Sequence, residues 1–369
     1  MAGSSTGTIF TVTTWGESHG PATGVVVDGC PAGIALSEAD IRAALERRKS
    51  RGLASATPRV EPDEARILSG VFEGMTTGTP ISILIPNADT RSGDYDRLRN
   101  VYRPGHGDIA YQAKYGVRDH RGGGRASGRE TAARVAAGEV ARRVLASAGI
   151  EVLGYTRSIG TVTISEPNLS AASESPAGGA WPSRAAVEES VLMCPDPVAT
   201  GQMLALLDEV LADGDSIGGV VQVVARHVPA GLGEPVFEKL DASLAAALMS
   251  IGTVKAVEVG EGVRAATMRG SEDNDAILAG GYGSNHAGGI LAGISDGADI
   301  VVRAHCKPIP SISIEQQTTT VGGEPTTVVV GGRHDVCVLP RIVPVAEAMV
   351  AITLADHLLR QRAQRGEVR

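Results

Sequence analysis

The chain has 369 residues, of which 43% are hydrophobic, 21% charged and only 3% aromatic, and its formal net charge at pH 7 is −8. This length can bury one large core or two modest ones, and the composition is that of a soluble globular protein. An acidic chain with few aromatic side chains is a poor candidate for a general nucleic-acid binder, which needs a basic stripe or stacking platforms.

Neither a leader nor a membrane span is evident in the sequence. No N-terminal segment combines a basic region with an apolar one, and no apolar run approaches the ~18 to 20 residues that cross a bilayer. We therefore expect a cytoplasmic protein without a membrane partner. The cysteines lack CxxC spacing, so we predict core thiols, with neither a metal site nor a disulfide framework, at Cys30, Cys194, Cys306 and Cys337.

Hydrophobic periodicity and turn residues predict strands and helices in alternation. In chain order we expect strands over 8–14 and 24–27, a helix over 38–49, strands over 67–72 and 81–85, helices over 130–148 and 198–212, a strand over 218–228, a helix over 236–251, strands over 254–259, 289–294, 300–306 and 326–330, and a helix over 342–364. Ser37 is the expected N-cap of the first helix, and Pro197 and Pro235 stand near two other helix starts.

This order of elements indicates an α+β or a layered α/β class. The segment 165–182 is rich in Ser, Ala, Gly and Pro, and we interpret it as a surface loop within a single domain that spans residues 1–369. No repeat with a period of 20 to 50 residues is present, which excludes solenoids and propellers.

The most informative segment runs from Arg103 to Gly138. Five arginines lie between Arg118 and Arg134 against only two acids, Asp119 and Glu130, in a chain that is acidic overall. Helix N-termini attract anions through free N–H groups and the helix dipole, and guanidinium groups add bidentate donors. Ser127 and Glu130 have capping-box spacing, and Gly149 has the position of a C′ glycine. The segment therefore predicts a pocket for a small anionic ligand at a helix start.

The glycines of this segment do not form a known nucleotide motif. Gly128 falls one residue late for G-x-G-x-x-G after Gly122 and Gly124, and a polar segment precedes them where a Rossmann fold has an apolar strand. The P-loop pattern G-x-x-x-x-G-K-[ST] is also absent. We therefore predict a fold that is not a Rossmann fold.

Several polar loops follow predicted strands and each alone is a weak signal. They are Gly16-Glu17-Ser18-His19-Gly20, Arg103-Pro104-Gly105-His106, Ser284-Asn285-His286-Ala287-Gly288-Gly289-Ile290, Lys307 to Ser311, and Arg333-His334-Asp335 with Cys337. Taken together, in this order, and with the Arg125 to Arg129 segment, they resemble the signatures of the chorismate synthase family. The resemblance spans roughly residues 7 to 350.

The resemblance implies a fold, a reaction and a cofactor. The fold is the family's layered β-α-β sandwich. Members convert 5-enolpyruvylshikimate 3-phosphate to chorismate by an anti 1,4-elimination of phosphate that needs reduced FMN, which is not consumed. NADPH enters only as an indirect reductant, and the expected assembly is a homotetramer. A phosphate and two carboxylates on the substrate account independently for the excess of arginine.

The resemblance also implies roles for individual residues. His19 would protonate the departing phosphate, His106 would supply a proton to the flavin system, and Asp335, with Ser18 and Ser127, would manage the proton that leaves the ring through flavin N5. The substrate or the phosphate edge of the flavin would contact Arg48, Arg103, Arg129 and Arg333. The flavin would contact Arg125, Ala126, Ser127, Gly252, Thr253, Ala292, Lys307, Pro308, Ile309, Pro310, Ser311 and Arg333.

Some of these positions depart from the family pattern. Ala54 stands where bacterial relatives have a second arginine after Arg48, and Arg51 is the candidate to supply that contact. Other differences fall at backbone-contact positions and predict modest tuning of flavin binding: Ala126, Gly128, Gly252, Thr253, Ala292, Ile309 and Pro310.

Two alternatives to a simple lyase stay open. One is a bifunctional form that also reduces flavin with NADPH, although no nucleotide fingerprint supports a separate NADPH site. The other is a module that binds RNA or polyphosphate through residues 103–134, which predicts binding with a steep salt dependence and no need for flavin.

Overall fold

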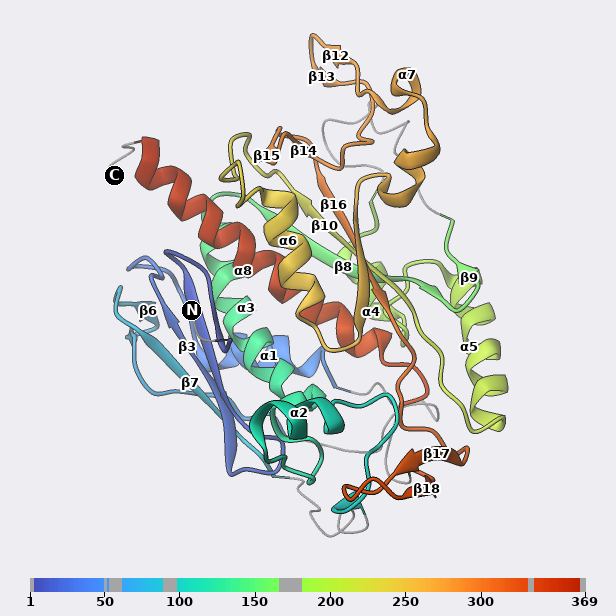
Figure 1. Ribbon diagram of the computed structural model, residues 1–369. Helices are drawn as coiled ribbons and strands as arrows, with labels where there is room; N and C mark the ends of the chain where they lie inside the picture. Colours follow the sequence, from blue (N-terminus) through green and yellow to red (C-terminus); the bar gives the residue numbers. More distant parts are fainter. Residues whose placement is uncertain are drawn as a thin grey trace.

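The computed structural model describes residues 3–49, 52, 62–88, 98–165, 181–330 and 335–365. Two five-stranded antiparallel sheets enclose a layer of helices (Figure 1), which confirms the predicted α+β class and layered sandwich. The first sheet has the order β1 (Ser5–Thr6), β2 (Thr11–Gly16), β3 (Ala22–Asp28), β7 (Ile81–Pro86) and β4 (Arg66–Ile67). The second has the order β11 (Val254–Val259), β16 (Ile300–Cys306), β10 (Gly219–Arg226), β8 (Glu151–Ile159) and β9 (Val162–Thr163).

Helices and short hairpins complete the described part of the fold. The hairpins are β5 (Val71–Phe72) with β6 (Met75–Thr76), β12 (Ile277–Leu278) with β13 (Gly281–Tyr282), β14 (Ile290–Leu291) with β15 (Ile294–Ser295), and β17 (Gln316–Thr319) with β18 (Pro325–Val328). The helices are α1 (Glu38–Glu46), α2 (Asp108–Tyr115), α3 (Thr131–Ala146), α4 (Arg184–Glu189), α5 (Pro197–Ala212), α6 (Leu240–Met249), α7 (Gly270–Asp273) and α8 (Leu339–Arg365).

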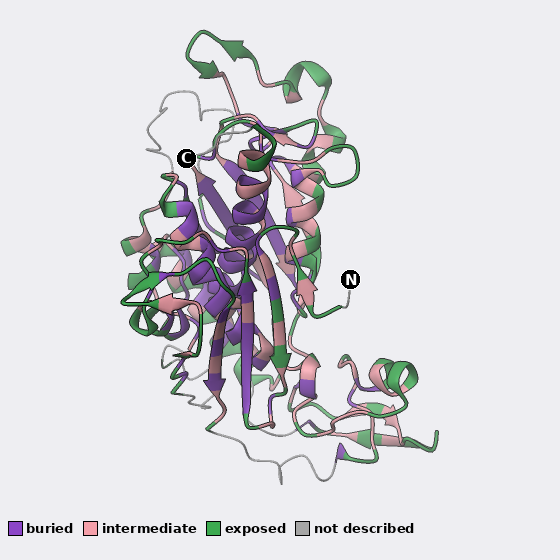
Figure 2. Ribbon diagram, turned by 90° about the vertical axis from the view of Figure 1, so that its left-hand side faces the viewer, coloured by how far each residue is buried: buried purple, intermediate pink, exposed green. Residues whose placement is uncertain are grey.

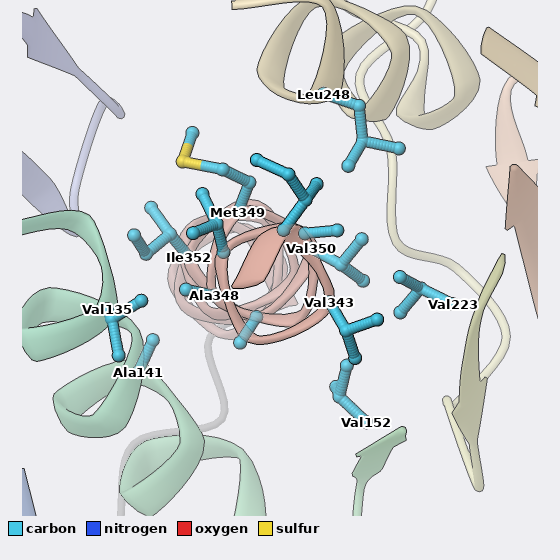
Figure 3. Packing of buried hydrophobic residues seen from close by; sticks show 14 of the residues in the cluster. Val135, Ala141, Val152, Val223, Leu248, Val343, Ala348, Met349, Val350 and Ile352 are labelled. Carbon is cyan, nitrogen blue, oxygen red and sulfur yellow. The ribbon is translucent and has the colours of Figure 1, made fainter. Parts of the chain in front are cut away.

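Helix α8 occupies the centre of the molecule. It packs against α3 on one side and against β8, β10 and α6 on the other, so its apolar residues point in every direction (Figure 3). Val343, Ala348 and Val350 are almost completely buried. A helix that is apolar all round is expected to be buried in this way. Figure 2 shows the result: the interior is buried, whereas the hairpin of β12 and β13 projects from the body and is exposed.

One described helix, α8, is long and apolar enough to cross a membrane by length and composition alone, which is weak evidence for a membrane span. The helix has 27 residues and a window of mean hydropathy 1.6, and 89% of that window is buried inside the fold. Two internal carboxylates interrupt its apolar surface: Glu347 binds arginine, and Asp356 accepts the N–H groups of residues 8–10. A mostly buried core helix passes the same test as a membrane span, and this burial favours the core role.

The predicted helix ends are confirmed where the capping residues are close to one another in sequence. Ser37 and Asp40 form a reciprocal capping box at α1, and Pro197 opens α5. Gly149 has a φ of +74°, and the Ile150 N–H donates to the Leu145 carbonyl at 3.1 Å, as in a Schellman motif.

The predicted capping box of Ser127 with Glu130 does not form. The Ser127 hydroxyl caps a short 3₁₀ turn through the Arg129 N–H at 3.4 Å, and α3 begins only after that turn. The Glu130 carboxylate accepts instead from Arg134 Nε at 3.0 Å. An ion pair along the helix thus replaces the reciprocal cap.

Strand predictions hold best where apolar runs are long. Strands β11 and β16 match the predicted ranges, whereas 67–72 and 289–294 each divide into short strands around a tight turn. The predicted helix over 236–251 begins four residues late, at Leu240. Strand β8 is absent from the predicted elements because Gly154 interrupts its pattern. A Cβ on Gly154 would lie 2.9 Å from Glu347 Cγ, so this glycine lets α8 approach the sheet.

The predicted surface loop over 165–182 falls mostly on residues 166–180, which lie outside the described residues. All four cysteines are buried free thiols, which confirms their predicted place in the core.

Candidate active site

A cavity of about 1700 Å³ lies between the first sheet and the helix layer. It gathers residues that are far apart in the chain: His19 follows β2, Arg48 follows α1, and Asp335 precedes α8. The predicted site residues that line it are His19, Arg48, Arg103, His106, Arg125, Ala126, Ser127, Arg129, Gly252, Thr253, Lys307, Ile309, Pro310, Ser311 and Asp335.

Three other predicted positions among the described residues do not line this cavity. Ser18 is buried behind His19, and Pro308 lies between two lining residues without facing the cavity itself. Ala292 occupies the exposed turn between β14 and β15, with a φ of +52°. Arg333 lies outside the described residues, as do Arg51 and Ala54.

The triple glycine, residues 122–124, brings the backbone against His19. All three glycines have positive φ, and a Cβ on Gly122 would lie 2.5 Å from His19 Cε1. Only glycine therefore allows this loop to cover the imidazole. Ser18 Oγ lies 3.0 Å from His19 Nδ1 and 3.5 Å from the Arg121 carbonyl oxygen. Glycine and serine together fix the ring at the cavity wall.

Arg125 holds the glycine loop to the first sheet. Its guanidinium donates to the Gly16 carbonyl at 3.1 Å and to Thr14 Oγ1 at 2.7 Å. The side chain thus ties the exit of β2, which carries His19, to the turn that precedes α3.

His106 is held by hydrogen bonds at both ring nitrogens. Nδ1 lies 3.1 Å from the Pro104 carbonyl oxygen, and Nε2 lies 3.0 Å from Ser311 Oγ. A carbonyl can only accept, so Nδ1 carries a proton, and in the neutral ring Nε2 accepts from the Ser311 hydroxyl. This arrangement positions Nε2 as the nitrogen that can take up and release a proton.

Arg103 is anchored by a carboxylate that the sequence analysis did not single out. Its Nε and Nη2 donate to Asp108 at 2.9 and 2.8 Å, and Arg118 lies 3.6 Å from the same carboxylate. Although burial opposes it, hydrogen bonding and charge from Arg103 lower the pKa of Asp108. The pair is buried and therefore rigid, and Asp108 is the first residue of α2.

Asp63 is a second buried carboxylate that sequence reasoning missed. It forms an ion pair with Arg129, whose Nε also donates to Asn87 Oδ1 at 2.8 Å, and it lies 3.7 Å from Arg48 Nη1. Asp63 is 1% exposed and has a φ of +50°. Two arginines thus share one carboxylate at the cavity wall.

Arg48 lies where positive charge is in excess. Its Nε donates to Thr131 Oγ1 at 2.9 Å and its Nη2 to the Gly128 carbonyl at 3.1 Å. Burial, and then the charge of Arg341, lower the pKa of the Arg48 guanidinium to about 9, with Asp63 acting in the opposite direction. A buried cation surrounded by other cations favours an anionic ligand.

Arg341 is the third site residue that sequence reasoning missed. It is on the first turns of α8, lines the cavity, and donates from Nη1 to Asp335 Oδ2 at 2.6 Å. The sequence offers one signal for a functional role of Arg341: it is the single charged residue within the apolar run 338–346. Asp63 and Asp108 carry no comparable signal, because their roles depend on neighbours from other elements.

Comparison with known proteins agrees with this geometry. The family model described as chorismate synthase matches residues 10–359. The chain is 59% identical to a chorismate synthase from Syntrophus aciditrophicus, over 98% of this chain and 99% of that protein. It is 58% identical to one from Syntrophobacter fumaroxidans, over 97% of this chain and 98% of that protein.

A solved structure shows the same likeness in three dimensions. The crystal structure of a chorismate synthase superposes with a TM-score of 0.77 at 33% sequence identity, over 96% of this chain and 93% of that chain. The order of motifs, the cavity on which they converge and these matches lead to one conclusion: the chain belongs to the chorismate synthase family.

Proposed function

We propose that this chain converts 5-enolpyruvylshikimate 3-phosphate to chorismate and phosphate, as a carbon–oxygen lyase that depends on reduced FMN. The observation that carries the proposal is the convergence of His19, His106 and Asp335 with several arginines on one cavity in a family member. The substrate has three anionic groups, and Arg48, Arg103 and Arg129 supply fixed, buried guanidinium donors for them.

His19 is the proposed proton donor to the leaving phosphate. Phosphate leaves more easily when it is protonated, so an imidazolium beside it favours the elimination. Ser18 supports this role: its hydroxyl can donate to the Arg121 carbonyl while it accepts from His19 Nδ1–H. The opposite nitrogen of the ring then carries the proton for the phosphate.

We assign the remaining proton transfers to His106 and Asp335. His106 would supply a proton to the flavin, and Asp335 would take the proton that leaves the substrate ring. The Ser311 hydroxyl keeps His106 Nε2 in one place, and Ser127 lines the cavity as a further hydroxyl. Asp335 offers a carboxylate oxygen as the acceptor of the ring proton.

The residues around the cavity fit a bound flavin. A Cβ added to Gly252 or to Gly128 would meet no atom within 4 Å, so both walls leave open space for a flat ring. Lys307 donates to the Gly105 carbonyl at 2.8 Å, and burial, together with Lys255, lowers its pKa. The flavin contacts we propose come from Ala126, Ser127, Gly252, Thr253 and residues 307–311. When bound, reduced FMN supplies electron density to the substrate and recovers it.

An anaerobic assay tests the proposal directly. Protein, substrate and chemically reduced FMN should yield equal amounts of phosphate and chorismate, and omission of reduced FMN should abolish both. Release of phosphate without chorismate, or the absence of both products with correctly folded protein, would contradict the proposed function.

The same assay covers the bifunctional alternative. No feature of the described residues favours a separate NADPH site, so NADPH with oxidised FMN should give no product without an added reductase. The RNA-binding alternative is also disfavoured, because the guanidinium groups of Arg103 and Arg129 are buried in the cavity and do not form an exposed stripe.

We further propose a homotetramer that works in the cytoplasm. Large apolar side chains lie on the surface at Val236, Phe237, Val263 and Ile277, with exposed fractions of 76% to 93%, and such residues are typical of subunit contacts. Four buried free thiols suit a reducing compartment. Light scattering of the purified protein measures the number of chains.

A further inference from the structure

Arg341 is one of the cations in the cavity wall to which the family resemblance assigns no role. Helix α8 is apolar around it, and its side chain is 26% exposed toward the cavity. Placing a guanidinium here brings it close enough to Arg48 to disfavour the charge on that buried group. Since like charges in a buried site are unfavourable, the position requires a compensating contact.

That contact is the carboxylate of Asp335. Arg341 Nη1 lies 2.6 Å from Asp335 Oδ2, which is short for a charge-assisted hydrogen bond. Asp335 is 7% exposed and lies just before α8, whereas Arg341 is the third residue of the helix, within its first turn. Helix α8 therefore holds Arg341 rigidly, and Arg341 in turn fixes the Asp335 carboxylate near the N-terminal end of the helix.

A second contact links the pair to the anion-binding wall. Arg341 Nε points at the Arg48 carbonyl oxygen, 3.4 Å away, at the end of α1. One guanidinium thus touches both the backbone of a substrate-binding arginine and the proposed proton acceptor. These two come from opposite ends of the sequence.

We propose that Arg341 is a positioning residue, which orients the Asp335 carboxylate toward the reacting ring and holds it in register with Arg48. The inference rests on the proposed function, because it gives Asp335 the role of proton acceptor. No bond is made or broken at Arg341. It fixes the Asp335 carboxylate by donating to Oδ2.

The test compares Arg341→Met with Arg360→Met. Arg360 is on the same helix, also lines the cavity and pairs with Glu238 at 2.6 Å, but it lies far along α8 from Asp335. Misplacement of a reacting group by about 1 Å can cost ~10²-fold in rate. We therefore expect R341M to lower kcat about 100-fold with a less than threefold change in KM and in FMN affinity, and R360M to retain kcat.

Two readouts separate positioning from a merely structural role. Added guanidinium ion should restore part of kcat in R341M and have no such effect on R360M. Deuterium on the ring carbon that loses its proton should give a larger isotope effect in R341M than in the unchanged protein, because proton removal becomes slower. Equal losses of kcat in both variants, or a loss in R341M without rescue and without a larger isotope effect, would overturn the proposal.

Asp335→Asn and a crystal structure keep this inference distinct from the proposed function. If D335N retains activity while R341M loses it, the positioning role is wrong although the lyase reaction stands. If the unchanged protein forms no chorismate, the proposed function fails. The R341M crystal structure then decides by itself: displacement of the Asp335 carboxylate supports positioning, and an unmoved carboxylate refutes it.

Discussion

Three of the arginines around the cavity are paired with carboxylates of the same chain. Arg103 pairs with Asp108, Arg129 with Asp63, and Arg341 with Asp335. Such pairs are rigid because both partners are largely buried, and removal of one partner leaves the other charge uncompensated. A ligand with several negative groups therefore meets donors whose positions are already set. This arrangement reduces the ordering cost of binding.

His106 gives a direct test of function against stability. Its ring binds Pro104 and Ser311 but belongs to a glycine-flanked loop outside the apolar core. His106→Ala should lower kcat by roughly 10² to 10⁴-fold, the range for loss of a general acid or base. The melting temperature should change by only a few degrees, because a surface loop contributes little packing. Calorimetry and the anaerobic assay measure both quantities, and a matched loss of stability and activity would indicate a structural role.

At the scale of elements, the contact between α3 and α8 determines how the helix layer closes. Gly138 of α3 lies directly against Ala348 of α8, and a Cβ at Gly138 would stand 2.3 Å from the Ala348 Cβ. Both helices are buried at this crossing (Figure 3). Small residues at both positions allow the close approach, which also sets the distance between α8 and the two sheets.

Gly138→Ala should therefore destabilise the protein although alanine is the better helix former. Overpacking in a core costs typically ~1 to 3 kcal/mol. The matched control is Gly201→Ala in α5, where an added Cβ meets no atom within 4 Å. That change should stabilise the fold by about 0.5 to 1 kcal/mol. Denaturant unfolding of both variants checks the prediction, and equal responses would show that the crossing tolerates a methyl group.

Local chemistry explains which elements the sequence predicts. The cap at Ser37 depends on Asp40 three residues later, and both were visible in the sequence. Strand β8 was missed because the need for Gly154 arises from α8, nearly two hundred residues away. Glu130 differs for a local reason: Arg134, four residues later in α3, donates to its carboxylate in place of the predicted cap.

At the scale of the whole molecule, Glu347 joins parts of the chain that are distant in sequence. It is 1% exposed on α8, accepts from Arg47 at 2.5 and 2.9 Å and from the Gly154 N–H at 2.8 Å, and has Arg142 and Arg184 nearby. Burial alone would raise its pKa, but Arg47, with Arg184 and Arg142, lowers the pKa to about 2. A single carboxylate thus neutralises cations from α1, α3 and α4.

This lowered pKa predicts how stability depends on pH. In the unfolded chain this carboxyl group has its ordinary pKa of about 4.5, so the stabilisation is complete above that pH. It is lost as the pH falls from about 4.5 toward 2. Glu347→Gln should cost about 3 to 5 kcal/mol at pH 7, because three cations lose a buried partner. Denaturant unfolding between pH 3 and 7 should show the difference from the unchanged protein shrinking in acid. A constant difference would contradict the prediction.

The candidate site was largely predictable because its histidines and arginines lie in short motifs whose order resembles one family. His19, His106 and Asp335 do line a common cavity. Arg341, Asp63 and Asp108 could not be found in this way, since each acts through a partner that only the fold brings close. The exposed turn at Ala292, outside that cavity, was equally unpredictable from spacing.

The central place of α8 has a consequence for biosynthesis. Residues 339–365 leave the ribosome after both sheets have been made, yet β8 and β10 of the second sheet pack on this helix, whereas the first sheet packs on α3. The nascent chain therefore exposes the inner face of the second sheet, and the side of α3 that contacts α8, until α8 has been made. Such intermediates aggregate readily, so production of this protein in a host cell should depend on chaperone capacity.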